Sequence, residues 1–321
     1  MLDRIDSPPI PTLSAPAIAA LPAWARGKNP PQTEAEAAFL AGAALALLDA
    51  IVRTEPLWFG VWRQRLALRA AVASVARSGR REGEAALRDA FHLTRPGADP
   101  GPAGRRLVAW RALTVASPGR WRSQIERAAQ ALDVPHDEAL RAAIEAAAAC
   151  ADGNRLAPFA ALRAYRLARA ALTAGKMGAG EGELLAAGLA DMVLALKLKW
   201  PFAMPLFGAG WRGAARQLAG ESDAGQGVAI LMGYARAAAD ACDLAADLAR
   251  RAQKLGEAAP KLRAKGAGAA LQALLDEDSL SAAGKIPRLS ERGARRLFER
   301  LLALGAIREL TGRATFRLYG L

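Results

Sequence analysis

The sequence predicts a mainly α-helical protein, in which a multi-helical antiparallel body precedes a small C-terminal domain with one helix and one β-hairpin. Ala, Leu and Arg dominate the composition, and all three favour helices, whereas aromatic residues make up only 6%. Short turn signals separate successive amphipathic segments, as in a compact helical body. Alternating strand-like residues are concentrated after Gly305. These three observations define the fold class.

The charge of the chain favours polyanionic partners. Its 321 residues allow two domains, and a 52% hydrophobic content is ample for a buried core. The net charge is +13, which favours nucleic acid first and an anionic membrane surface second. From Lys285 onward nine basic residues face three acidic ones, giving +6, so the positive charge is densest at the C-terminal end.

The cysteines and the N-terminal residues indicate a cytoplasmic protein. Cys150 and Cys242 are far apart in alanine-rich segments, so neither a disulfide framework nor a metal site is expected. Asp3 and Asp6 occupy the region where a secretion signal carries positive charge. The longest apolar run, residues 37–48, is too short to span a bilayer and predicts a buried core helix. No membrane partner is expected.

Residues 1–32 contain many prolines and predict an extended N-terminal arm. Leu21 and Trp24 could anchor this arm as a docking tail, but a loosely packed leader is the favoured interpretation. Thr33 and Glu36 have the spacing of a capping box, which predicts that the first helix begins there and runs to about Arg53.

The second helix is expected from Pro56 to Gly79 with a tryptophan stripe on its apolar face. The residues assigned to that face are Trp58, Trp62, Leu66 and Val72, and those assigned to solvent are Arg63, Arg77, Arg80 and Arg81. A strip for nucleic acid made of Trp62, Arg63, Arg65 and Arg69 is the less favoured alternative. Tryptophans four residues apart on a helix usually pack inward.

Further helices are expected over residues 84–93, 105–114, 121–132, 137–150, 156–174, 183–199 and 228–256. The all-α body therefore occupies residues 33–260. Residues 261–321 form the linker and the terminal domain, because the segment after Pro260 is basic and contains glycine.

Familiar catalytic chemistry is not signalled. His92 and His136 are the only histidines, and phosphate-binding loops, nucleophile elbows and zinc motifs are missing. We therefore predict no catalytic residues, no metal and no cofactor. The carboxylates at Asp240, Asp243 and Asp247 could hold a divalent cation, but a solvated helix face paired with Arg236, Arg250 or Arg251 is favoured.

The segment from Lys285 onward has the pattern of a winged helix-turn-helix. Ser290 predicts an N-cap, Gly305 ends the helix, and two short strands follow around residues 311–313. The apolar face of this helix consists of Ala294, Leu297, Phe298 and Leu301. Residues 279–289 are too short and too interrupted by proline to hold a full positioning helix.

Arginines on the opposite face of that helix and on the hairpin predict a DNA-binding surface. The helix could enter the major groove, where arginines contact guanine or phosphate, while the hairpin touches the backbone. The predicted DNA-binding residues are Arg292, Arg295, Arg296, Arg300, Arg313 and Arg317.

Three strings carry a family resemblance: PLWFGVWRQRLALRAA at residues 56–71, ADMVLALKLKWPFAMPL at 190–206, and GARRLFERLLALGAIRELTGRATFRLYGL at the C-terminal end. They resemble the alphaproteobacterial family called domain of unknown function 1403. The last string also resembles the winged helix that follows Fic-type helical domains. The Fic catalytic string is missing, so AMP transfer is not implied. The resemblance implies a bacterial cytoplasmic protein, often of plasmid-bearing rhizobia, without an assigned activity.

The leading hypothesis is a DNA-binding regulator or plasmid-maintenance factor, with the helical body serving dimerisation or ligand sensing. One alternative is a protein-interaction scaffold whose winged end docks on a protein partner or on its own body. Another is an enzyme that uses carboxylates such as Asp191 or Asp243, which requires a deep polar pocket in the helical body.

Overall fold

The structure is a computed structural model that divides into two compact units. It describes residues 18–26, 31–95, 97–114, 118–173, 179–214, 223–262, 264, 266–311, 313 and 316–321. One unit, here called the helical body, contains Ala19–Thr54 and Arg65–Asp243. The other, here called the terminal unit, contains Glu55–Gln64 and Leu244–Leu321. Helices α2 (Phe59–Arg77) and α10 (Asp223–Ala258) each contribute residues to both units.

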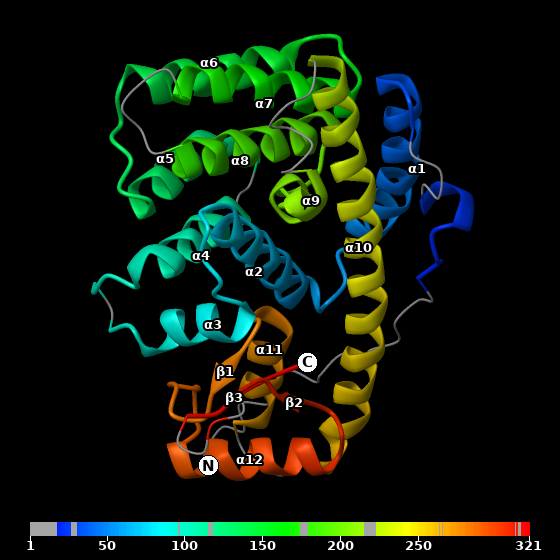
Figure 1. The fold of residues 1–321 in the computed structure, drawn as a ribbon. Coiled ribbons are helices and arrows are strands. Elements are labelled where there is room, and N and C mark those ends of the chain that lie inside the picture. The colour runs from blue at the N-terminus through cyan, green and yellow to red at the C-terminus, as the bar shows by residue number, and fades with distance from the viewer. Residues whose placement is uncertain are drawn as a thin grey trace. The chain divides into compact units, whose positions relative to one another are not determined.

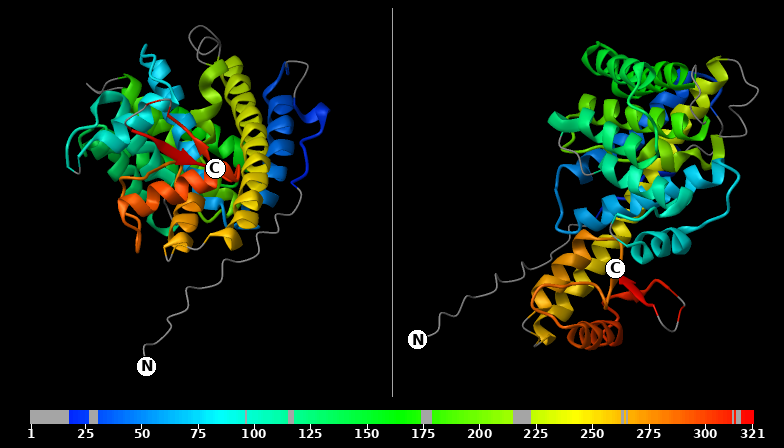
Figure 2. Two further views of the ribbon diagram at one scale, coloured as in Figure 1. Left: turned by 90° about the horizontal axis from the view of Figure 1, so that it is seen from below. Right: turned by 90° about the vertical axis from the view of Figure 1, so that its left-hand side faces the viewer.

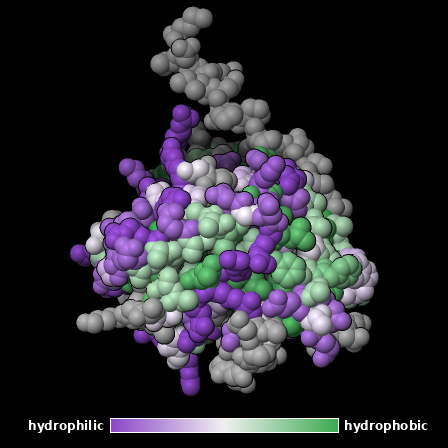
Figure 3. Space-filling view, turned by 90° about the horizontal axis from the view of Figure 1, so that it is seen from above, coloured by the Kyte–Doolittle hydropathy of each residue, from purple (hydrophilic) through white to green (hydrophobic). Residues whose placement is uncertain are grey.

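The helical body is built from short antiparallel helices. Its central pair is α7 (Ala157–Thr173) and α8 (Ala179–Leu198), with α6 (Glu138–Asp152) packed on both (Figure 1). Helix α4 (Gly101–Thr114) packs against α3 (Glu84–Leu93) and α5 (Trp121–Ala131), and α9 (Leu206–Ala214) packs against α8. A short 3-10 turn, η2 (Pro118–Arg120), precedes α5. On the face that carries α6 and α7, hydrophilic side chains border and cross a band of apolar ones (Figure 3).

Helix α1 (Glu34–Val52) begins at the predicted capping box. The Thr33 side chain accepts the backbone N–H of Glu36, and the Glu36 carboxylate accepts the N–H of Thr33, which confirms this prediction. The short 3-10 helix η1 (Ala23–Arg26) packs against α1, and Ala25 within it and Leu21 just before it are buried. Most of the predicted N-terminal arm lies outside the described residues.

Helix α2 has the predicted tryptophan stripe, and of the four arginines assigned to solvent Arg80 and Arg81 are exposed whereas Arg63 and Arg77 are not. Trp58, Trp62, Leu66 and Val72 are all buried. Arg63 and Arg77 are largely buried as well, and burial lowers the pKa of Arg77 to about 10. Arg77 forms an ion pair with Glu183 of α8, a partner that is more than 100 residues away and invisible to helix periodicity. The alternative nucleic-acid strip is also excluded, because Trp62 and Arg65 are buried.

The terminal unit combines the end of α10, a 3-10 turn η3 (Ala259–Lys261), α11 (Ala267–Asp276), α12 (Glu291–Ala303) and three short strands (Figure 2). Strands β1 (Leu280–Ser281), β2 (Arg308–Glu309) and β3 (Leu318–Gly320) form an antiparallel sheet in the order β1-β3-β2. The start of α2 packs on α11 so closely that a Cβ at Gly60 would lie 2.5 Å from the Cα of Asp276.

Most helices lie within a few residues of their predicted ranges, and α3 matches its range residue for residue. Two elements of the terminal unit were not anticipated. Helix α11 falls in and beyond the segment interpreted as a linker, and β1 adds a third strand to the predicted hairpin. Residues 286–289, where a full positioning helix was judged absent, make a single turn closed by the Leu289 N–H on the Ile286 carbonyl.

Candidate nucleic-acid interface

Local sequence determines where α12 begins and ends. The Ser290 side chain accepts the backbone N–H of Gly293 at 3.2 Å, as expected for an N-cap. At the other end Gly305 adopts φ 64°, and the Ala306 N–H bonds the Leu301 carbonyl, a helix stop that favours glycine. Both predicted ends of the helix are confirmed.

The apolar face of α12 fixes the helix within the terminal unit. Its predicted members Ala294, Leu297, Phe298 and Leu301 are all buried. The Phe298 ring packs on the Tyr319 ring of β3, with centroids 4.9 Å apart. Helix and sheet are therefore joined through a shared core, and the opposite face of α12 is turned to solvent.

Three arginines form a stripe on the solvent face of α12, and we call Arg292, Arg296 and Arg300 the arginine stripe. All three are exposed. None makes an ion pair or a side-chain hydrogen bond with another residue in the described part of the chain. At 1.5 Å per residue the stripe is about 12 Å long, close to the width of the major groove of B-DNA. These guanidinium groups are available to an external anion.

The other predicted arginines differ from the stripe in their surroundings. Arg295 pairs with Glu291 one turn earlier, and Arg317 lies 3.8 Å from Glu309 across β2 and β3. Arg313 is exposed in the hairpin, whose neighbouring Gly312 is outside the described residues. Each internal carboxylate reduces the positive potential of its arginine, so the stripe is the strongest part of the predicted surface.

The Thr311 hydroxyl closes the hairpin that carries Arg313 and Arg317. It accepts the backbone N–H of Leu318 at 3.0 Å and donates to the carbonyl of Phe316 at 3.1 Å. The Leu310 N–H bonds the Leu318 carbonyl at 2.7 Å just before it. The two strands are short, so this side-chain bridge replaces part of a backbone ladder.

The carboxylates considered for an enzyme have structural partners. The Asp191 side chain is only 2% exposed and accepts the backbone N–H of Phe207 at 2.9 Å, which caps α9. Burial raises the pKa of this carboxyl well above its ordinary value, although the N–H groups of Phe207 and Gly208 oppose the shift. The fully buried Tyr234 hydroxyl approaches the carboxyl without a hydrogen bond of standard geometry.

Two of the three carboxylates in the acidic stripe of α10 also pair with arginines. Asp243 receives two hydrogen bonds from Arg26, at 2.9 and 3.0 Å, and Asp247 pairs with Arg250 and Arg251. The predicted partners Arg250 and Arg251 are thus confirmed for Asp247. No group of three His, Cys, Asp or Glu side chains that could hold a metal ion occurs among the described residues.

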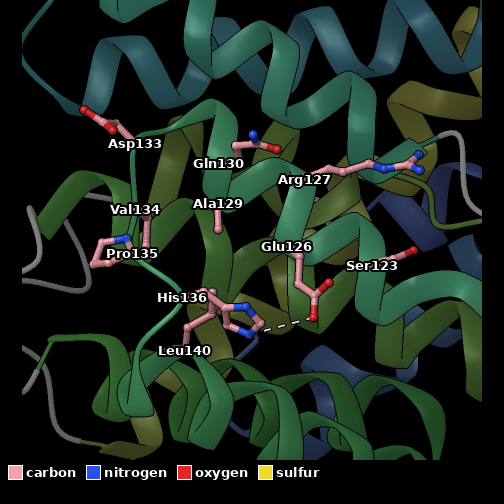
Figure 4. A pocket seen from close by; sticks show the side chains of 10 residues that line it. All are labelled: Ser123, Glu126, Arg127, Ala129, Gln130, Asp133, Val134, Pro135, His136 and Leu140. Atoms are coloured by element: carbon pink, nitrogen blue, oxygen red, sulfur yellow. Dashed lines mark ion pairs between the residues drawn. The ribbon is translucent and has the colours of Figure 1, made fainter.

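An open cavity of about 580 Å³, lined by both polar and apolar side chains, lies on the surface of the helical body between α5 and the start of α6 (Figure 4). Ser123, Glu126, Arg127 and Gln130 line it from one face of α5, since they are spaced three and four residues apart. His136 lies opposite, with its Nε2 3.7 Å from a carboxylate oxygen of Glu126.

A second cavity of about 620 Å³ shares Gln130 and Asp133 with the first. Asp133 lies two residues after α5 and has φ 60°. Its side chain is exposed, and Arg105 lies 3.5 Å away. Arg105 also holds Asp99 through two hydrogen bonds. These exposed groups are suited to reversible contact with a polar molecule. In the first cavity Ser123 does not form a hydrolytic triad with His136 and Glu126, because its hydroxyl donates to the carbonyl of Arg120.

Neither cavity was anticipated from the sequence, and neither is lined by Asp191 or Asp243. The available signal was the four polar residues on one face of α5 followed by His136. That pattern is typical of any solvated helix, so it does not identify a cavity.

The fold and these surfaces define a mainly helical protein with a small three-stranded sheet and an arginine-bearing helix in its terminal unit. The chain belongs to the family described as Protein of unknown function (DUF1403), whose model matches residues 12–321. No curated protein matches the sequence.

Proposed function

We propose that the protein is a DNA-binding regulator or plasmid-maintenance factor of the cytoplasm, and that residues 261–321 act as a winged helix. Helix α12 enters the major groove and the β2–β3 hairpin contacts the phosphate backbone. The helical body serves dimerisation or ligand sensing.

The observation that carries the proposal is the arginine stripe. Three exposed guanidinium groups without internal partners on one helix face repel one another by about 0.2–0.5 kcal/mol per pair, and a bound anion would relieve this repulsion. Arginine also forms paired hydrogen bonds with guanine and with phosphate oxygens. A DNA duplex offers both groups, guanine edges in the major groove and phosphate oxygens beside it.

The order of elements around α12 supports the same proposal. Strand β1 pairs with β3, the last strand, so that the sheet order is β1-β3-β2. Helix α12, with its N-cap Ser290, precedes the β2–β3 hairpin. This arrangement is expected for a winged helix, in which the helix before the hairpin reads DNA. Arg313 and Arg317 belong to the hairpin, where they can reach phosphates beside the groove.

The salt dependence of binding tests the proposal. With about four phosphate contacts, the affinity for a double-stranded oligonucleotide should fall with a log-log slope near −3.6. Changing the arginine stripe to glutamine removes three charges, so we expect the slope to weaken to about −1. Fluorescence anisotropy between about 50 and 200 mM salt measures both slopes.

A matched control separates local contacts from net charge. Arg122, Arg141 and Arg163 are exposed in the helical body, and changing them to glutamine removes the same total charge. The control variant should keep the wild-type slope. Binding that does not depend on salt, or equal losses in the two triple variants, would refute DNA recognition by α12.

Docking of the terminal unit on an acidic protein is the rival function, because the same stripe fits a carboxylate surface. Hydrogen exchange discriminates the two. Protection of α12 backbone amides that requires added duplex supports DNA binding, whereas protection by a protein partner without DNA supports the rival.

A further inference from the structure

Glu299 is a carboxylate in the middle of the solvent face of α12. Its side chain is exposed, and the described part of the chain offers it no ion pair and no side-chain hydrogen bond. At about 100° per residue, Glu299 lies within about 30° of the line opposite the apolar face, as do Arg292 and Arg296. Arg300, the third member of the arginine stripe, lies about 70° from the same line. A molecule that contacts the arginine stripe therefore also contacts Glu299.

The order of charges along α12 explains why Glu299 has no partner within the helix. A helical ion pair is more favourable when the acidic residue is four positions before the basic one. Glu291 and Arg295 have this order and are paired. The residue four positions after Glu299 is Ala303, which carries no charge. Both nearby arginines precede Glu299, which is the less favourable order, and one of them, Arg295, is held by Glu291. The Glu299 carboxylate is therefore available to a partner outside the helix.

A free carboxylate at this place opposes the binding of a duplex unless the DNA supplies a hydrogen-bond donor. Duplex DNA carries about one negative charge per 1.7 Å of its axis, so its phosphates repel Glu299. Contact also removes water from the carboxylate, and a charge that loses water without gaining a hydrogen bond is destabilised. Phosphate oxygens are acceptors and cannot provide that bond. The donor must therefore belong to a base.

The major groove offers two kinds of donor, the N4 amino group of cytosine and the N6 amino group of adenine. The adenine amino group lies beside the acceptor N7 of the same base, which repels a carboxylate. Guanine and thymine present acceptors in this groove, N7 and O6 on guanine and O4 on thymine. Cytosine is therefore the base that suits a carboxylate best.

We propose that Glu299 determines sequence preference by accepting a hydrogen bond from the N4 amino group of a cytosine in the major groove. This role rests on the proposed function, since it requires α12 to lie in that groove. Arg296 lies about 4.5 Å earlier along the helix axis, close to the rise of about 3.4 Å between base pairs. A guanine bound by Arg296 is therefore expected on the base pair next to the cytosine. Contacts of the arginine stripe with phosphates position the helix, whereas Glu299 discriminates between bases.

Selection from a pool of DNA duplexes with a randomised central segment tests this role. Duplexes retained by the full-length wild-type protein should share a cytosine at one position, with a guanine on a neighbouring base pair. Fluorescence anisotropy then compares a selected duplex with one in which thymine replaces that cytosine, at the same salt concentration. The affinity of the wild-type protein should fall by about 10-fold, because the thymine O4 faces the carboxylate.

Two substitutions of Glu299 have different expected effects on the base preference. Glu299→Gln should change the preference at that position from cytosine to adenine, because a glutamine amide donates to N7 and accepts from N6 of adenine. Glu299→Ala should lose the preference there and bind every duplex more tightly, because the repulsion by phosphates is removed. Glutamine and alanine are good helix formers, so α12 is retained in both variants.

Glu291→Gln is the matched control, because it removes the same charge from the same helix. It releases Arg295 and should therefore strengthen binding to all duplexes. Its preference for cytosine at the selected position should equal that of the wild-type protein. A loss of that preference would mean that net charge, and not the position of Glu299, determines the selection.

The failure of this role and the failure of DNA binding have different signatures. Salt-dependent binding without a preferred cytosine overturns the role of Glu299 and leaves DNA binding intact. A cytosine preference that survives in Glu299→Ala, or a gain in affinity without any change in the ranking of duplexes, overturns that role in the same way. Absence of salt-dependent binding to every duplex in the pool overturns both the proposed function and the role of Glu299.

Discussion

Replacing Asp191 by asparagine should make the helical body more stable than the wild type, by an amount that grows as the pH rises. The Asp191 carboxyl is buried between α8 and α9, and burial raises its pKa well above the ordinary value. An asparagine has nearly the same shape and can still accept the backbone N–H of Phe207. Asp191→Asn therefore removes the titration and preserves the cap of α9.

The sign and size of the effect follow from proton linkage. An aspartate in the unfolded chain has a pKa of about 3.9. Below that pH Asp191 is protonated in both the folded and the unfolded state, and its contribution to stability is complete. Above it the unfolded chain releases the proton while the folded chain retains it. The free energy of unfolding then falls by about 1.4 kcal/mol per pH unit until the raised pKa of the folded state is reached. Asp191→Asn has no such loss.

Urea denaturation followed by tryptophan fluorescence at about pH 4.5 and about pH 6.5 measures the difference. The advantage of Asp191→Asn over the wild type should grow between these values. Asp191→Ala leaves the start of α9 uncapped and should be less stable at both, by about 1–3 kcal/mol. If Asp191→Asn is destabilised equally at both pH values, Asp191 is ionised in the folded protein and the reasoning is wrong.

Three other substitutions test individual contacts by chemical denaturation. Gly60→Ala should destabilise the terminal unit by about 1–3 kcal/mol, because its Cβ would overlap the backbone of α11. Gly268→Ala in the same unit places its Cβ in open space and should be neutral or stabilising. Equal effects of the two substitutions would contradict the close packing of α2 on α11. The buried indole N–H of Trp110 donates to the Ser74 hydroxyl at 2.8 Å. Ser74→Ala removes this acceptor and should lower the free energy of unfolding by about 1–3 kcal/mol. An unchanged free energy of unfolding would mean that water replaces the hydroxyl. Thr33→Ala should cost about 1 kcal/mol through the lost cap of α1, and unchanged stability would show that the first turn of α1 is frayed.

Features encoded by neighbouring residues could be predicted from the sequence. Thr33 with Glu36, Ser290 and Gly305 define helix ends through bonds that close within one turn, so their spacing alone locates those ends. The buried face of α12 follows in the same way from the period of its apolar residues. The arginine stripe was predicted as part of a larger set, because the face opposite a buried face must meet solvent.

Features that depend on distant partners could not be predicted. Strand β1 has two residues and exists through pairing with β3, almost 40 residues later in the chain. Arg77 was assigned to solvent because the sequence does not place Glu183 beside it. The burial of Asp191 depends on α9 and α10 packing over α8. The cavities beside α5 depend on the conformations of the connections between α3 and α4 and between α5 and α6.

The cap that Asp191 provides also bears on the order in which the body folds. Helix α9 has nine residues, three of them glycine, so it is too short and too glycine-rich to persist alone. The acceptor for its first N–H groups is on α8, 16 positions earlier. During synthesis α8 emerges first, and α9 gains its cap only when it docks there. We therefore expect α9 to be among the last helices of the body to form, and amide exchange during refolding should detect its late protection.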